Sequence, residues 1–153
     1  MGAMDVVLMV LGILATVALV LALVWIPISR RLKVIAVEME RELASSGERV
    51  VVAPEAANYR GATSGYGRVK GNGIVALTER RLVFRKIVGD PVEIPVDQIA
   101  GVHLEKWFLR AYSSGRPVVV LSTRSGVEVG FIFDDAEAWA SRLRAVEGTA
   151  PAH

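Results

Sequence analysis

The sequence contains no cysteine, and it has only two histidines among its 153 residues. Without cysteine the chain cannot form a disulfide, a thiolate zinc site, a redox pair or a cysteine nucleophile. Basic residues are missing from the first 29 positions, so all 18 lysines and arginines lie at or after Arg30. From Arg30 onward the net charge is only +3 (18 basic and 15 acidic residues), which excludes a strongly cationic nucleic-acid-binding protein. Hydrophobic residues make up 52% of the chain, which excludes intrinsic disorder of the whole.

The first segment is a long run without formal charge. Between Asp5 and Arg30 lie 24 uncharged residues, which as a helix would reach about 36 Å and exceed the ~30 Å hydrocarbon core of a bilayer. Of these residues, 15 are leucine, isoleucine or valine, which favours insertion. Pro27 removes one helical hydrogen bond, so we expect the regular span to end near Ile26. The sequence therefore predicts a transmembrane anchor over residues 1–29.

Two other interpretations of this run fit less well. A cleaved signal peptide needs basic residues at its amino end and an apolar stretch of about 7–15 residues, whereas this run is longer and follows Asp5. A core helix this apolar on every face does not fit a domain of only about 120 residues. Arg30, Arg31 and Lys33 follow the run, so the positive-inside rule places the N-terminus outside the cell. The C-terminal part of this single-pass cell-membrane protein is then cytoplasmic.

The pattern of residues 30–46 is helical, because four apolar residues recur at spacings of three and four. These residues are Leu32, Ile35, Met39 and Leu43. We predict a juxtamembrane stalk helix that lies on the membrane or packs against the following domain. A short coiled coil that dimerises the anchor is the other interpretation, although the stripe covers less than two heptads.

After Gly47 the apolar period changes to two, which predicts strands. The glycine-rich stretch 57–73 is either a long flexible connection or a strand with a glycine-rich lip. Residues 78–81 have the composition of a tight hairpin turn. We expect about seven antiparallel strands in a small barrel or sandwich. Apart from the glycine-rich stretch, the expected strands are 49–53, 74–78, 81–87, 92–96, 99–109, 117–123 and 127–133.

The chain is expected to end in one amphipathic helix that covers the open end of the barrel. Asp134 can cap this helix, with Glu137 three residues further on. The apolar stripe, with Trp139 facing inward, comprises Ala136, Trp139, Leu143 and Val146. A disordered tail is expected at 149–153. The predicted domain thus spans residues 47–148 and is of the α+β class.

Three segments of this domain have a recognisable pattern. Residues 73–84 contain a glycine, a short apolar strand, Leu-Thr, basic residues and an apolar triplet that ends in phenylalanine. Residues 92–99 contain an isoleucine-proline pair followed by a second isoleucine, and residues 123–126 with Phe131 have the pattern of a last hairpin. Together they resemble the GRAM and bacterial PH-like domains over residues 47–147. The resemblance implies a PH-like fold on a single-pass anchor, as in some small bacterial membrane proteins, and it implies no particular ligand.

Some PH domains bind phosphoinositides through basic residues around the first hairpin. By this resemblance, candidate contacts for anionic lipid or a partner are Arg68, Lys70, Arg80 and Arg81. Trp107 and Phe108 are also candidates, because only one of two adjacent side chains on a strand can point into the core. The other side chain either faces outward, where it can contact lipid or protein, or is covered by a neighbouring element.

No arrangement of residues indicates catalysis. His103 has no convergent partners at strand or helix spacing, and residues 65–71 lack the spacing of a phosphate-binding loop. The sequence therefore predicts no enzyme activity, no cofactor, no metal site and no nucleic-acid partner. We expect a membrane-anchored, non-catalytic interaction module that binds a membrane-associated protein. The alternatives are an anionic-lipid-binding domain and an accessory subunit of a membrane enzyme or transporter.

Overall fold

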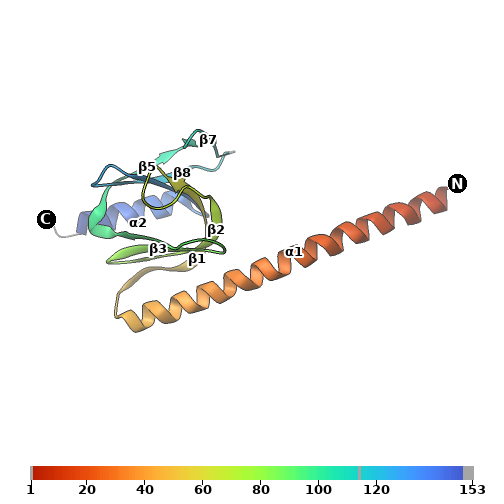
Figure 1. Cartoon of the computed structure of the whole chain (residues 1–153), viewed down its shortest axis with the longest axis horizontal. Helices are drawn as coiled ribbons and strands as arrows, with labels where there is room; N and C mark the ends of the chain where they lie inside the picture. Colours follow the sequence, from red (N-terminus) through yellow and green to blue (C-terminus); the bar gives the residue numbers. More distant parts are fainter. Residues whose placement is uncertain (1, 114, 150–153) are drawn as a thin grey trace.

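The computed structural model describes residues 2–113 and 115–149, and Figure 1 shows one long helix beside a β-rich domain. The helix, α1 (Ala3–Ser46), has 44 residues, and an 18-residue window within it has a mean hydropathy of 3.0. The rest of the chain buries none of that window. As predicted, the chain thus begins with a helix that is long and apolar enough to cross a membrane.

α1 continues through Pro27 without a break, so the expected end of the regular helix near Ile26 is wrong. The proline removes only one of the many backbone hydrogen bonds of this 44-residue helix, and the remaining bonds on either side keep the helical conformation. The helix ends at Gly47, whose φ of +74° lies in the left-handed region that favours glycine. The predicted anchor (1–29) and stalk (30–46) therefore belong to one continuous helix.

A seven-stranded antiparallel sheet follows, curled into a half-barrel, with the strand order β4-β3-β2-β1-β9-β8-β5. The strands are β1 (Val50–Ala62), β2 (Gly71–Thr78), β3 (Arg81–Lys86), β4 (Val92–Pro95), β5 (Ile99–Glu105), β8 (Val118–Thr123) and β9 (Glu128–Phe133). The short helix η1 (Val96–Gln98) joins β4 to β5, and the hairpin of β6 (Trp107–Phe108) and β7 (Ala111–Tyr112) lies between β5 and β8. The seven expected antiparallel strands are confirmed, but the single strand expected at 99–109 is divided between β5 and β6.

β1 is longer than predicted and takes up the first part of the glycine-rich stretch. Its Tyr59 ring is fully buried, with its centroid 5.8 Å from that of Phe84 and 5.4 Å from that of Phe131. Packing of this ring outweighs the low strand propensity of Gly61. Gly61 has a φ of +103° and lies where the register of the β1–β9 pairing shifts. A strand with a glycine-rich lip is therefore the correct alternative, and the connection to β2 is confined to residues 63–70.

α2 (Ala136–Thr149) closes the core of the half-barrel (Figure 1). Trp139 is fully buried, stacks on Phe133 with ring centroids 4.2 Å apart, and donates its indole N–H to Glu55. The whole predicted stripe is buried, which confirms the inward-facing residues as Ala136, Trp139, Leu143 and Val146.

The residue that caps α2 differs from the expected one. Asp135 is the cap, because its Oδ1 accepts a hydrogen bond of 3.0 Å from the backbone N–H of Ala138. Asp134 follows directly after β9, and its carboxylate lies 3.4 Å from the guanidinium of Arg116 instead. Of the tail expected at 149–153, Thr149 is the last residue of α2, and residues 150–153 lie outside the described residues.

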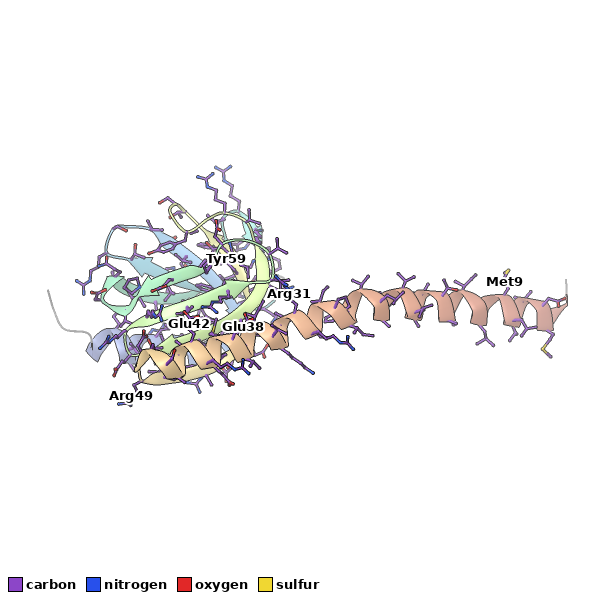
Figure 2. All side chains as sticks on the ribbon, turned by 60° about the horizontal axis from the view of Figure 1, so that its bottom comes forward. Met9, Arg31, Glu38, Glu42, Arg49 and Tyr59 are labelled. Carbon is purple, nitrogen blue, oxygen red and sulfur yellow. The ribbon has the colours of Figure 1, made fainter. Side chains whose placement is uncertain are left out.

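The second half of α1 packs on the outer face of the sheet. Ile35, Met39 and Leu43 are buried there against Ile74 and Ala76 of β2 and Val83 of β3. The Arg85 guanidinium also forms an ion pair with Glu42, which Figure 2 places beside the domain. The apolar stripe of the stalk is thus covered by its own domain. This corrects the alternative in which the stripe forms a dimeric coiled coil.

Candidate functional site

The four basic residues that are candidate contacts lie at two ends of the domain. Arg68 and Lys70 precede β2, whereas Arg80 and Arg81 follow it. Because β2 has eight residues, it spans about 25 Å between the two pairs. The four candidates therefore do not form a single patch, since side chains at opposite ends of this strand cannot contact one headgroup.

Arg81 is held by acidic residues of its own chain. Its side chain is only 20% exposed and lies 3.1 Å from the carboxylates of both Glu48 and Glu93. Glu48 also accepts a hydrogen bond of 2.7 Å from the Thr78 hydroxyl. This hydrogen bond lowers the pKa of Glu48, burial opposes it, and Arg81 lowers the pKa further. The network fastens the α1–β1 connection to the β2–β3 turn, so Arg81 is a structural residue rather than a ligand contact.

Arg80 lines an open pocket of about 820 Å³ at the end of the domain where α1 and α2 both end (Figure 1). We call it the arginine pocket, and its lining residues are Arg49, Val51, Glu79, Arg80, Pro95, Val96, Asp97, Arg142, Ala145 and Val146. Within the described part of the chain, Arg49, Arg80 and Arg142 form no ion pair. The pocket therefore combines apolar walls with three guanidinium groups that form no ion pair among the described residues.

Two acidic residues complete the lining of the arginine pocket. Glu79 is exposed, and the Oδ1 atom of Asp97 is buried without a hydrogen-bond partner among residues 2–113 and 115–149. Guanidinium groups bind carboxylates through paired hydrogen bonds, and the apolar walls suit an aliphatic side chain. Sequence reasoning missed Arg49 and Arg142, because only the curl of the sheet brings the start of β1 beside the last turns of α2.

A second exposed surface lies at the other end of the domain, on the β6–β7 hairpin. Trp107 is 62% exposed, and its ring lies opposite that of Tyr112 with centroids 5.1 Å apart. Phe108, the other candidate of the pair, is only 7% exposed and belongs to the core. Of the two alternatives for the side chain that points away from the core, the outward-facing one is therefore correct and the covered one is wrong, and Phe108 is excluded as a surface contact.

The inner face of the hairpin fixes it to the sheet. Phe108 packs on the outer sheet face, against Val118, Val120 and Ile132. Its ring also occupies the space above Gly130, where a Cβ would come within 2.6 Å of the Phe108 ring. The turn residues Leu109 and Arg110 have φ angles of +50° and +63°, as a two-residue type I′ turn requires. Such angles are strained in residues other than glycine, so the packing of Phe108 maintains this turn.

The connection 63–70 lies beside the tip of the hairpin. The two segments share a hollow of about 440 Å³ lined by Thr63, Arg68, Lys70, Leu109 and Arg110. The Tyr59 hydroxyl holds the connection from inside by donating to the Gly67 carbonyl at 2.6 Å. Burial raises the pKa of Tyr59 to about 12, so this hydroxyl keeps its proton at physiological pH. The glycine-rich connection is thus tied to the core.

Among residues 2–113 and 115–149, no group of three histidine, aspartate or glutamate side chains lies close enough together to hold a metal ion. The Nε2 atom of His103 lies 3.5 Å from Glu105, and both side chains are 40% or more exposed. This pair sits on the surface of β5 and is not part of either pocket.

The fold belongs to the class of curled antiparallel half-barrels closed by a C-terminal helix. No family model and no curated protein matches this sequence. Among solved structures, the chain is similar to the crystal structure of the C-terminal domain of an unknown protein from Leishmania infantum. The TM-score is 0.52 with 14% sequence identity, over 72% of this chain and 95% of the other. At this identity the likeness concerns the fold alone.

Proposed function

We propose that this protein is a membrane-anchored, non-catalytic interaction module with a PH/GRAM-like domain in the cytoplasm. The apolar half of α1 crosses the cell membrane once, with the N-terminus outside. The unburied apolar window supports the crossing, and Arg30, Arg31 and Lys33 support the orientation through the positive-inside rule. The order of strands and the closing helix support the PH-like assignment, together with the resemblance of residues 73–84 and 92–99.

The packing of α1 on the sheet is the observation that carries this proposal. Because Ile35, Met39 and Leu43 are buried against the sheet, the domain is fixed to its anchor rather than tethered by a flexible linker. A fixed domain presents the same surface to every partner that shares the membrane. Confinement to one membrane also raises the effective concentration of such partners, so that weak contacts suffice.

The arginine pocket is the surface that we assign to the protein partner. It lies at the end of the domain away from the apolar half of α1, and it is therefore open to the cytoplasm (Figure 1). Arg49, Arg80 and Arg142 lack ion pairs within the described part of the chain, so an incoming carboxylate need not displace an existing one. The partner segment is accordingly acidic, with an aliphatic side chain for the apolar walls.

Site-specific photocrosslinking in native membranes tests this proposal. Benzoylphenylalanine at Ala145, inside the pocket, should give a defined adduct with an acidic segment of one membrane-associated protein. The adduct should be lost in the double variant Arg80→Glu/Arg142→Glu and kept in the control Arg41→Glu, which reverses an exposed charge on α1. An adduct that survives the double variant would refute the pocket as the binding site. The captured protein also decides whether the module serves a membrane enzyme or transporter.

A further inference from the structure

The second half of α1 has an exposed apolar side opposite the side that packs on its own domain. Ile35, Met39 and Leu43 are buried against the sheet, whereas Val34 is 55% exposed and Val37 is 45% exposed. At about 100° per residue, these two sets of side chains point about 180° apart around the helix axis. We call the exposed side the outer stripe, and its residues are Val34, Val37, Arg41 and Ala44.

We propose that the outer stripe is the contact between two copies of this chain, which form a parallel dimer through their α1 helices. This inference rests on the membrane anchor of the proposed function but not on the arginine pocket. It uses a different side of α1 from the coiled coil considered for Leu32, Ile35, Met39 and Leu43. The domain covers that side and leaves the outer stripe open, as the position of the domain along one side of α1 shows (Figure 1).

Lipid does not cover the outer stripe. Val37 lies nine residues after Ile28, the last aliphatic residue before the basic cluster, which is about 13 Å along the helix axis. The headgroup layer on one side of a bilayer is only about 5–8 Å thick. In a single copy the Val37 side chain is therefore in water. Valine is a weaker helix former than most residues, so helix stability does not explain two exposed valines one turn apart.

The outer stripe continues along the same side of α1 into its membrane half. Eighteen residues make about five whole turns, so residues eighteen positions before the stripe lie in line with it. With the neighbouring Gly12, this side of the membrane half comprises Gly12, Thr16, Leu19, Leu23 and Ile26. A Cβ at Gly12 would have no neighbour within 4 Å, and small residues allow two membrane helices to approach closely. A partner that covers both halves must cross the bilayer and continue as a helix, as a second copy does.

The charges beside the outer stripe fit a parallel copy in register. Val34 and Val37 occupy positions a and d of a heptad. Lys33 is then at position g, and Glu38 is at position e. In a parallel pair, a g residue faces the e residue five positions further along the other helix, so Lys33 of one copy faces Glu38 of the other. Twofold symmetry gives this ion pair twice. Neither residue has an ion-pair partner among residues 2–113 and 115–149.

Arg41, at the next a position, fits the same arrangement. A side chain at a lies beside the g residue that precedes it in the other helix, and that residue is Glu40. A basic residue at a single a position fixes the register of a two-stranded coiled coil at a cost in stability. The stalk covers less than two heptads, so the membrane half is needed to complete the contact. A fragment without the membrane half is therefore expected to be monomeric.

A dimer of this kind presents two equal arginine pockets. Each domain packs on the side of α1 that faces away from the contact, so the two domains lie outside the helix pair and do not collide. The twofold axis runs along the membrane normal, which places both pockets at the same distance from the membrane. A partner with two acidic segments can then bind both pockets, and its affinity rises without any new kind of contact.

Disulfide crosslinking of the full chain in lipid vesicles tests the contact, because the chain has no cysteine of its own. Val37→Cys lies in the outer stripe, and Ser46→Cys is an exposed position on the opposite side of α1. A disulfide requires the two Cα atoms to lie within about 7 Å of each other. We expect mild oxidation to link the chain into dimers several-fold more through position 37 than through position 46. Equal linking at both positions would show random collision and refute the contact.

Charge exchange in the Val37→Cys chain tests the direction and register of the pair. Lys33→Glu and Glu38→Lys each place like charges opposite one another and should reduce the crosslinking several-fold. The double variant Lys33→Glu/Glu38→Lys restores opposite charges and should restore the crosslinking. Single variants without effect, or a double variant as weak as the single ones, would refute the parallel pair in register.

A count of copies separates this inference from the proposed function. A fluorophore at Val88→Cys, in the turn between β3 and β4 where Val88 is 84% exposed, should bleach in two steps in vesicles of low protein density. Val34→Ser/Val37→Ser should shift the count to one step. Single-step bleaching with the native stripe, in a chain that resists carbonate extraction, would refute the dimer and leave the anchor standing. If carbonate extracts the chain itself, the anchor of the proposed function fails.

Discussion

The packing of α1 on the sheet predicts that the domain needs residues 30–46 to fold. Burial of Ile35, Met39 and Leu43 contributes about 1.5–3 kcal/mol each, or about 5–9 kcal/mol together as an upper estimate. A domain of this size is stable by only about 5–15 kcal/mol in total. A fragment 47–153 should therefore be unfolded or aggregated, since it also exposes Ile74 and Val83 on the outer sheet face. A fragment 30–153 should fold as a monomer.

Chemical denaturation of the fragment 30–153 gives the magnitude for a single side chain. Met39 is only 1% exposed, so Met39→Ala should lower the free energy of unfolding by about 2–5 kcal/mol. Val37 is 45% exposed on the same helix, and the control Val37→Ala should change it by less than about 0.5 kcal/mol. Equal stability of the fragments 30–153 and 47–153, or a Met39→Ala effect as small as that of Val37→Ala, would show that α1 is not docked on the sheet.

Three further predictions concern the core, the acid stability and the orientation of the protein. In fragment 30–153, Trp139→Ala should lower the free energy of unfolding by about 3–5 kcal/mol. Trp139→Phe retains the stacking on Phe133 and should lower the free energy of unfolding less. Equal losses in the two variants would contradict the stacked geometry. The hydrogen bond from Thr78 lowers the pKa of Glu48 below its ordinary value of 4.5. Glu48 therefore stabilises the fold above that pH, and this contribution is lost as the pH falls through the folded pKa. Glu48→Gln should accordingly be less stable at neutral pH and lose less stability in that acidic window, which denaturation at a series of pH values measures. Protease treatment of intact cells should leave a C-terminal tag uncut, and digestion of the tag would reverse the orientation.

Some of the fold could be predicted because its causes are local. An uncharged run of 24 residues suffices to indicate a membrane-length helix, and a period of two between turn residues suffices to indicate β2, β3 and their hairpin. The stripe of α2 was predictable for the same reason, since the spacing of Trp139 and Leu143 places both on one face of a helix. These features depend on the periodicity of neighbouring residues rather than on distant contacts.

Other features were mispredicted because a local rule was outweighed. Proline lowers helix stability, yet one lost hydrogen bond at Pro27 does not end a helix of 44 residues. Glycine weakens a strand, yet the burial of Tyr59 against Phe84 and Phe131 extends β1 through the first part of the glycine-rich stretch. In the second case the deciding free energy comes from rings that lie far away in the sequence.

The candidate sites depended almost entirely on the tertiary structure. The sequence alone determined that the chain has an apolar N-terminal helix and an antiparallel β-rich domain, whereas only the tertiary structure showed that Trp107 is exposed and Phe108 is buried. The sequence could not show that Arg80 lies with Arg49 and Arg142, or that Arg68 and Lys70 lie with Arg110. Those groups form because the order and curl of the strands bring distant segments to one end of the domain. The order and curl are set by the packing of the whole core, which no local pattern encodes.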